Sequence, residues 1–341
     1  MAFISPSPSA LHIDSSLTKI SLMTLQTETA YVASKVFPNI PVSKESDFYH
    51  VYDDGSFFRS QMHVRQPGTE SAAIQWSLSK DKYQCQNYAL HALVTDGMRA
   101  NADDSLDLDW DTTTLLTHQK LLKHEKEWVE TCFVASDPGD IWDYALRGKD
   151  TRSTTVDPTN LDSNDVVFWN RSDSTPIADI LYMRSYVKRK TGINPNTLTI
   201  GNAVYDALCE HPDVVARINR GQTSGLASVT LQQMADLFRI KEIFIMEAVE
   251  EKTPEGLESE KDYIGGNHAL LTYKPLKPGL RTPSTGYTFN WSGLLGSRKS
   301  GLRVKKFRVP TLAADWLEIE TSFTEKITSK GMAGFFSSIV E

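Results

Sequence analysis

One stretch of the sequence holds the residue types of a phosphate-binding loop. The run "GLLGSRKS" (293–300) combines glycines with a lysine and a serine. A phosphate-binding loop needs glycine immediately before the lysine so that its backbone can wrap a phosphate, and Arg298 stands there. The sequence therefore predicts a basic turn, which continues through Arg303, Lys305, Lys306 and Arg308.

A second stretch has the spacing of calcium ligands. Asp107, Asp109 and Asp111 match the first three ligands of a calcium-binding loop. Such a loop also needs a glycine and a later bidentate glutamate, where this chain has Thr112 and His118. We expect these acids to stabilise the start of a helix, because carboxylates favour the positive end of its dipole. A loose divalent-ion site is the alternative.

The sequence lacks the local signatures of catalysis. His118 and His124 are six residues apart on a predicted helix and so lie on different faces. The serine of "GQTSG" (221–225) is displaced from the centre of a nucleophile elbow. HExxH, CxxC and a GxGxxG after a strand are also absent. We therefore predict no enzyme: no catalytic, cofactor-binding or metal-binding residue, and no cofactor.

Composition narrows the class further. The 341 residues carry a formal net charge of −7, which argues against a dedicated sequence-reading nucleic-acid binder. Cys85, Cys132 and Cys209 are few and far apart, so no disulfide framework is expected and a reducing compartment fits. No run of 18 apolar residues and no secretory signal is recognisable, so we expect no membrane contact.

The N-terminal part predicts an arm followed by a projecting hairpin. Residues 1–46 are Ser/Pro-rich and polar, with a short helix over about 25–36. Two runs rich in strand-forming residues, "FYHVY" (48–52) and "FFRSQM" (57–62), flank an Asp54-Gly55 turn. Neither face of this hairpin is cleanly polar. We therefore expect both faces to be in contact with protein, with the partners of the hairpin on another subunit.

The rest of the chain predicts a long helix, an α/β unit and a β-rich tail. In a helix over about 112–134, the residues on one side are Leu115, Leu122 and Val129, with Leu121, Trp128 and Cys132 beside them. A compact unit follows at 176–275, with strands at 196–201, 241–249 and 268–274. Its helices begin at Pro176 and at a capping box of Thr230 with Gln233. Residues 286–341 read as mostly β.

This order of segments resembles the major capsid proteins of tailed bacteriophages and related gene-transfer particles. Six runs spanning nearly the whole chain carry the resemblance: "KVFPNIPVSKESDFYHVYDDGSFFR" (35–59), "RQPGTES" (65–71), "RANADD" (99–104), "GINPNTLTIGNAVYDALCEHPDVVARI" (192–218), "GYTFNWSGLLG" (286–296) and "FFSS" (335–338).

The resemblance implies an α+β fold with five parts. These are an N-terminal arm (1–47), an extended β-hairpin loop (48–98), a peripheral domain (99–175) with a spine helix at about 111–135, an axial α/β domain (176–285), and C-terminal strands returning to the peripheral domain (286–341). The arm is too short for a cleaved scaffolding segment, so a scaffold would be a separate protein. Lys80 and Lys82 match no cross-linking motif.

The resemblance also implies a function and partners. The chain would assemble with copies of itself, as hexamers and pentamers, into an icosahedral shell around double-stranded DNA. Scaffold, portal and decoration proteins would be further partners, the DNA contact would be non-specific, and assembly would take place in the bacterial cytoplasm before the protein resides in the virion. The expected contacts between subunits are Phe37, Pro38, Tyr52, Asp54, Gly55, Phe57, Arg59, Pro67 and Gly68.

Two other functions stay open at this point. A cytoplasmic α/β enzyme would place its site within 176–275 and show a deep pocket of converging polar side chains. Another oligomeric phage component, such as a tail or sheath protein, would form tubes instead of closed shells.

Overall fold

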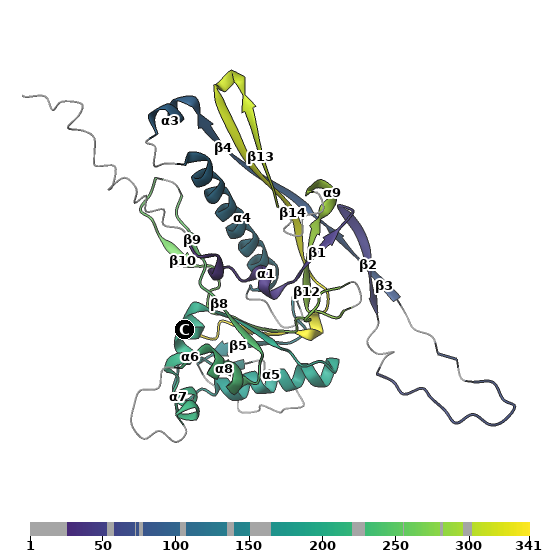
Figure 1. Cartoon of the computed structure of the whole chain (residues 1–341). Helices are drawn as coiled ribbons and strands as arrows, with labels where there is room; N and C mark the ends of the chain where they lie inside the picture. Colours follow the sequence, from purple (N-terminus) through teal and green to yellow (C-terminus); the bar gives the residue numbers. More distant parts are fainter. Residues whose placement is uncertain are drawn as a thin grey trace, which may run out of the picture.

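Two large sheets joined by one long helix form the body of the protein (Figure 1). The structure, a computed structural model, describes residues 26–52, 58–71, 73–74, 78–102, 107–134, 140–150, 165–219, 229–254, 256–279, 282–295 and 302–341. Within these ranges no helix is long and apolar enough to cross a membrane.

The first sheet is built around one very long strand. β14 (Ala314–Ile327) pairs antiparallel with β13 (Leu302–Val309), with β4 (Gln86–Thr95) and with β12 (Gly286–Trp291), and β12 pairs in parallel with β1 (Asn39–Val42). The mostly β character predicted for residues 286–341 is thereby confirmed in β12, β13 and β14. α3 (Asp96–Asn101) continues from β4, and α9 (Ser292–Leu295) follows β12.

The long helix α4 (Leu108–Cys132) lies against this sheet. Its inward residues are four apart, including Leu116, His124, Trp128 and Cys132, so they form one row along the helix. Leu116 packs with Leu317 and Ile319 of β14. The helix was predicted correctly. Of its predicted apolar side, Trp128 and Cys132 are buried and Val129 packs against the same core. Leu115 is exposed, which corrects its assignment to that side.

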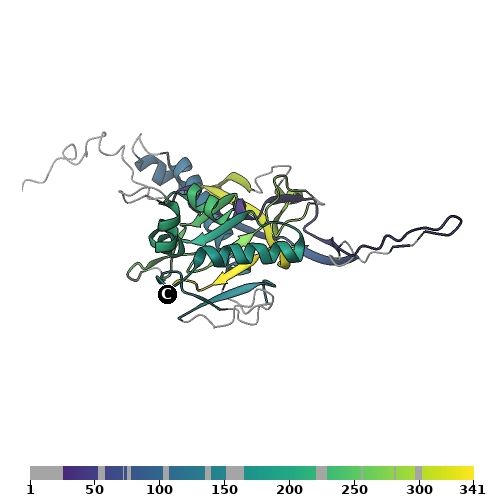
Figure 2. The same ribbon diagram turned by 90° about the horizontal axis from the view of Figure 1, so that it is seen from below.

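The second sheet has six strands, in the order β6-β5-β15-β11-β7-β8. Its strands are β5 (Ala145–Lys149), β6 (Asp165–Val167), β7 (Thr197–Gly201), β8 (Glu242–Met246), β11 (Ala269–Thr272) and β15 (Gly334–Ser337). One face packs on α5 (Pro176–Thr191), α6 (Asn202–Glu210), α7 (Pro212–Ile218) and α8 (Leu231–Phe238). Figure 2 shows α5 lying along this face.

Neighbouring side chains of this sheet alternate between two cores. Phe336 and Leu271 pack with the helices on one face, while Phe335 and Leu270 pack with the end of α4 on the other. The strands and the Thr230–Gln233 capping box predicted for 176–275 are confirmed. The sheet is larger than predicted, however, since β5, β6 and β15 come from outside the predicted axial range, and the tail therefore joins both sheets.

Two small strand pairs complete the fold. β2 (Ser46–Tyr52) pairs antiparallel with β3 (Leu78–Gln84), and β9 (Val249–Glu251) pairs with β10 (Lys261–Tyr263). The predicted hairpin is corrected here: the partner of β2 is β3, and residues 58–71 form neither helix nor strand. The predicted Asp54-Gly55 turn lies outside the described residues.

The segment before β1 contains little helix. A 3-10 turn (Glu28–Ala30) and α1 (Ala33–Val36) replace the helix predicted over 25–36. Val32, Val36 and Phe37 are nevertheless buried with Trp128 and Phe133 in the core between the sheets. The residues from Val32 onwards thus belong to the folded body of the subunit.

Candidate surfaces for contact between copies

The inner face of the β2–β3 pair packs on its own chain. The Tyr83 ring stacks on Phe289 of β12 with centroids 4.7 Å apart, and Tyr49 lies 5.9 Å from the same ring. The Tyr49 hydroxyl donates a 2.5 Å hydrogen bond to Asp81. Burial together with this carboxylate raises the pKa of Tyr49 above its ordinary value, so it stays a neutral donor.

The outer face of the same pair is open. Cross-strand neighbours share a face, and the register pairs Phe48 with Lys82 and His50 with Lys80. All four are exposed, and the Phe48 side chain is 65% accessible. The inner face thus packs on its own chain, contrary to the expectation that the partners of the hairpin lie on another subunit. The outer face stays a candidate for contact with another subunit.

Beyond the pair, residues 58–71 project away from the body (Figure 1). Met62 and Val64 are each 95% exposed, and Phe58 and Ile74 are also largely exposed. At the bend, Gly68 has a φ of 84°, and the Thr69 N–H donates to the Gln66 carbonyl at 3.2 Å. Pro67 and Gly68 form the centre of this turn, where the positive φ favours glycine. Exposed apolar side chains in such a row mark an interaction surface.

The predicted contact residues fall into three groups. Arg59, Pro67 and Gly68 lie exposed on the projecting loop. The side chains of Tyr52, Asp54 and Phe57, together with Gly55, lie outside the described residues.

Phe37 and Pro38 form the third group, and they are buried in their own subunit, which corrects their assignment to a contact. The Phe37 ring packs edge-on against Trp128 at 5.8 Å. It also covers Gly286 so closely that a Cβ there would lie 2.4 Å from Phe37 Cζ. The Phe37 ring is therefore part of the core of its own chain.

Three side chains fix the segment at 26–33 against α4 and β9. The Gln26 amide exchanges two hydrogen bonds with the backbone of Val249 in β9, at 2.5 and 2.9 Å. The Tyr31 hydroxyl lies 3.2 Å from His118 Nδ1. Glu125 accepts hydrogen bonds from the Val32 and Ala33 N–H groups at 2.9 and 2.8 Å. Burial raises the pKa of Glu125, while these N–H groups oppose that shift.

A second buried carboxylate joins α4 to β14. His124 Nε2 lies 2.7 Å from Glu325 Oε1, and both side chains are almost inaccessible. The Thr288 hydroxyl donates to the other Glu325 oxygen at 2.9 Å. Sequence reasoning missed this pair, because the partners are two hundred residues apart and neither stands in a motif. A histidine on the same helical row as Trp128 was the available signal.

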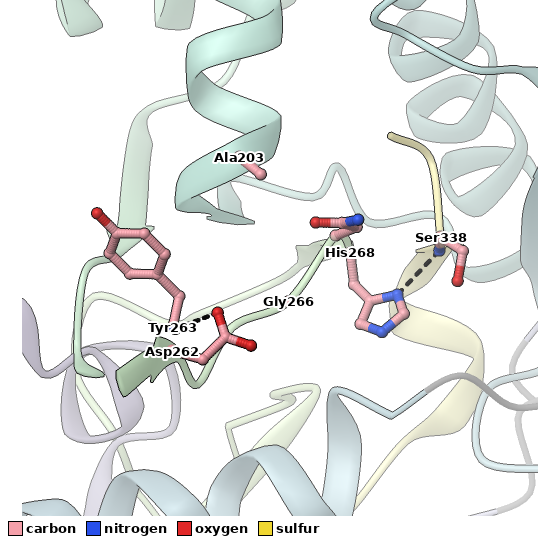
Figure 3. A pocket seen from close by; sticks show the side chains of 7 residues that line it. Ala203, Asp262, Tyr263, Gly266, His268 and Ser338 are labelled. Atoms are coloured by element: carbon pink, nitrogen blue, oxygen red, sulfur yellow. Dashed lines mark hydrogen bonds between the residues drawn. The ribbon is translucent and has the colours of Figure 1, made fainter. Parts of the chain in front are cut away.

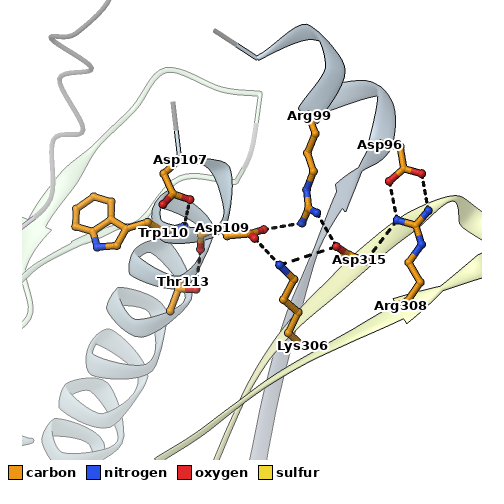
Figure 4. Close-up of polar contacts among 9 residues, drawn as sticks. All are labelled: Asp96, Arg99, Asp107, Asp109, Trp110, Thr113, Lys306, Arg308 and Asp315. Atoms are coloured by element: carbon orange, nitrogen blue, oxygen red, sulfur yellow. Dashed lines mark hydrogen bonds and ion pairs between the residues drawn. The ribbon is translucent and has the colours of Figure 1, made fainter. Parts of the chain in front are cut away.

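Acidic side chains of α3, α4 and β14 pair with basic side chains of α3 and β13 (Figure 4). Arg99 lies 2.7 Å from both Asp109 and Asp315. Lys306 pairs with Asp109, and Arg308 pairs with Asp96. The hydrogen bond from Lys306 is the main reason that the pKa of Asp109 is lowered.

Elsewhere on β13, Arg303 and Lys305 pair with Glu320, and Lys305 also with Glu318. All four described basic side chains of this strand are therefore engaged within the chain. Asp107 accepts from the Trp110 N–H at 3.1 Å, which confirms that the acids cap the helix. No group of three or more potential metal ligands occurs in the described part of the chain.

One open pocket of about 320 Å³ lies beside α6 and β10 (Figure 3). His268 lines it, and burial lowers the pKa of this imidazole to about 4. Its Nδ1 accepts a 2.9 Å hydrogen bond from the backbone N–H of Ser338, not from the hydroxyl. Asp262, also in the lining, is paired with Lys252. These contacts are structural, and they do not form a nucleophile with its base.

Comparison with known proteins gives consistent matches. The family model described as "Phage major capsid protein E" matches residues 162–284. The chain is 30% identical over 128 residues to the major capsid protein of Burkholderia phage BcepMu, which covers 35% of this chain and 38% of that protein. It is 22% identical over 309 residues to the major capsid protein of Pseudomonas phage JBD67, which covers 91% of this chain and 92% of that protein.

Solved structures match over nearly the full length. A phage-related protein from Bordetella bronchiseptica RB50 has a TM-score of 0.67 at 17% identity, covering 92% of this chain and 93% of that one. The capsid of cyanophage P-SCSP1u has a TM-score of 0.59 at 10% identity, covering 98% and 99%. An encapsulin from Synechococcus elongatus PCC 7942 has a TM-score of 0.50 at 11% identity, covering 96% of each chain.

These matches define the class. The chain has the α+β fold of phage capsid subunits, a fold that the encapsulin shares. In sequence it is similar to the major capsid proteins of bacteriophages. The resemblance seen in the sequence is therefore confirmed.

Proposed function

We propose that this chain is the major capsid protein of a bacteriophage, whose copies assemble into an icosahedral shell around double-stranded DNA. The observation that carries the proposal is the match to a phage major capsid protein over 91% of the chain, together with the capsid fold. The shared fold alone would fit an encapsulin equally well. The sequence relatives favour the phage shell.

The exposed surfaces support this function physically. The loop at 58–74 shows four large apolar side chains to solvent without a core of its own. Ordering it costs roughly 1–2 kcal/mol per residue in backbone entropy. Obligate assemblies supply interfaces of roughly 2,000 Å² or more, and contacts of that size offset such a cost. Within the proposal, Arg59, Pro67 and Gly68 contact a neighbouring subunit, as do Tyr52, Asp54, Gly55 and Phe57.

The remaining partners are part of the same proposal. Scaffold, portal and decoration proteins complete the shell, which assembles in the bacterial cytoplasm. The domain roles stay as predicted from the resemblance: an arm, an extended loop, a peripheral domain on the spine helix α4, and an axial domain. DNA contact is non-specific and weak, which fits the net charge of −7 and the engagement of β13 by acids of its own chain.

The enzyme alternative depends on a pocket in 176–275. The pocket beside α6 holds a histidine with a pKa of about 4 and a carboxylate paired with lysine, so the pocket gives that alternative no specific support.

Shortening the projecting loop distinguishes a shell protein, which needs the loop, from an enzyme, which does not. A variant with a short Gly/Ser linker in place of residues 58–74 keeps β2, β3 and both large sheets. We expect a soluble subunit whose thermal unfolding is close to wild type but which forms no particles in gel filtration with light scattering. We expect wild-type protein, prepared in parallel, to form particles of megadalton mass. Particle formation by the shortened variant would contradict the proposed role of the loop.

A further inference from the structure

The two ends of the strands in the six-stranded sheet carry different residues. β7 pairs with β8 and β11 so that Thr197 lies beside Glu242 and Thr272 at one end. At the other end Gly201 lies beside Met246. The first end receives the C-terminus of α5 and the residues that follow β11. The second end leads into α6 and into the β9–β10 pair.

The first end is basic. Its segments are 188–197, 239–242 and 273–279, and they contain one acid, Glu242, against seven bases: Lys188, Arg189, Lys190, Arg239, Lys241, Lys274 and Lys277. Asn196 holds these segments together. Its carbonyl accepts from the Lys241 N–H at 3.0 Å, and its side chain exchanges hydrogen bonds of 2.7 and 2.8 Å with the Lys274 backbone.

The second end is acidic. The described residues of 202–213 and 247–263 contain two lysines against nine carboxylates: Asp206, Glu210, Asp213, Glu247, Glu250, Glu251, Glu258, Glu260 and Asp262. Lys252 pairs with Asp262, and Glu250 is reached by Lys126 of α4. The Glu251 carboxylate accepts hydrogen bonds from the Ser259 and Thr253 hydroxyls. A large negative surplus remains on the exposed edge.

Apolar side chains accompany the charge at both ends. Leu276 is 83% exposed at the basic end, where Phe58 of the projecting loop also lies beside Gly192. Leu257 is 68% exposed at the acidic end, and Tyr263 is partly exposed there. Exposed leucines beside charges fit a protein partner better than a nucleic acid, which is bound chiefly through its phosphates.

The two ends face opposite sides of the molecule. In Figure 1, α6, β9 and β10 lie at the left, while the projecting loop, whose Phe58 touches the end of α5, lies at the right. A surface on one side that complements a different surface on the other side is a heterologous pair, the type that closes rings of identical subunits.

We propose that the basic end of the six-stranded sheet in one copy docks on the acidic end of the sheet in the next copy. This inference rests on the proposed shell function and adds the surfaces that join neighbours within a ring. Complementary charge selects the head-to-tail arrangement and speeds encounter, because like ends repel. The apolar side chains at both ends add burial once the copies are in register.

The helix dipole alone does not explain the basic end. Cations in the last turn of α5 would be favourable in any isolated helix, and this accounts for Lys188, Arg189 and Lys190. It does not account for Lys241, Lys274 and Lys277, which come from two other segments. Their gathering at one end is a property of the sheet.

Charge reversal at each end tests the pairing. The basic-end variant carries Lys188→Glu and Lys190→Glu, and the acidic-end variant carries Glu258→Lys and Glu260→Lys. We expect each variant to fold, as judged by circular dichroism and thermal unfolding, and to give about tenfold fewer particles than wild type. The control Lys44→Glu with Lys123→Glu makes the same change in net charge as the basic-end variant, within two local ion pairs, and we expect it to assemble normally.

The chain carrying all four changes gives the decisive result. Its basic end keeps five bases against three acids and its acidic end four lysines against seven carboxylates, so the two ends attract each other less than in either single-end variant. We expect this chain to give fewer particles than either single-end variant.

Three results would overturn the inference: single-end variants that assemble like wild type, a four-change chain that gives as many particles as the single-end variants, or basic-end variants that assemble but retain less nucleic acid. The last would indicate a nucleic-acid surface. A wild-type chain without particles would overturn the proposed function as well.

Discussion

Buried ionisable side chains act at the scale of single residues to hold the subunit together. Glu125 accepts two backbone N–H groups of the N-terminal segment, and His124 with Glu325 ties α4 to β14. Leaving one such buried donor without an acceptor costs about 1–3 kcal/mol. Glu125 therefore fixes the N-terminal segment, and the His124–Glu325 pair fixes α4 on β14.

His268 makes the stability of the subunit depend on pH. Phe133 and Phe335 surround the ring, and its pKa falls from 6.5 to about 4. The unfolded chain takes up this proton below about pH 6.5 and the folded chain only below about pH 4. The free energy of unfolding therefore falls as the pH drops through this window.

Comparison with a variant isolates this contribution. His268→Asn keeps an acceptor for the Ser338 N–H but cannot titrate. Between pH 7 and pH 5, we expect wild type to lose about 2 kcal/mol more of unfolding free energy than the variant, measured by urea denaturation of unassembled subunits. Equal losses in both proteins would show that His268 is not the titrating group.

At the scale of elements, the N-terminal segment divides into a core part and an open part. Phe37 is buried against Trp128, whereas Phe48, on the outer face of β2, is mostly exposed. Phe37→Ala should lower the unfolding free energy by about 3–5 kcal/mol through loss of buried contacts. Phe48→Ala should change it by less than about 0.5 kcal/mol.

Phe48→Ala should instead affect assembly. Phe48→Ala subunits fold normally, and we expect them to give fewer particles than wild type when particle yield is measured by gel filtration. A Phe48→Ala chain that unfolds more readily than wild type would show that its ring packs within its own subunit.

Local signals in the sequence were sufficient for elements defined by neighbouring residues. The Thr230–Gln233 capping box, the helix start at Pro176 and the strands around Leu198 and Leu270 were predicted because caps and short apolar runs are local. The partner of β2 was not predicted, because "FFRSQM" has the composition of a strand but lies in the projecting loop. Strand pairing depends on distant residues such as Tyr83, which stacks on Phe289.

The candidate surfaces were predicted less completely than the elements. Arg59, Pro67 and Gly68 do lie on an exposed loop, but an aromatic residue beside a proline looks the same in a core and at an interface, so Phe37 was misplaced. The charge at the two ends of the sheet could not be read from the sequence. Lys190, Lys241 and Lys277 are far apart in the chain and meet only through the order of the strands.

At the scale of the whole molecule, the fold is that of a subunit with several surfaces open at once. A loop carrying Met62 and Val64 projects from it, and the six-stranded sheet ends in opposite charges. A monomeric protein would lose solubility through such apolar exposure without gaining any function. In a closed lattice every one of these surfaces has a partner, which is why a shell accounts for them together.

Electron microscopy of the purified full-length chain tests the central claim most directly. The proposed function predicts closed shells of uniform size, built from many copies of this 38.2 kDa chain. Open tubes would indicate a tail or sheath component. A chain that stays monomeric under all conditions would contradict the assignment to a shell.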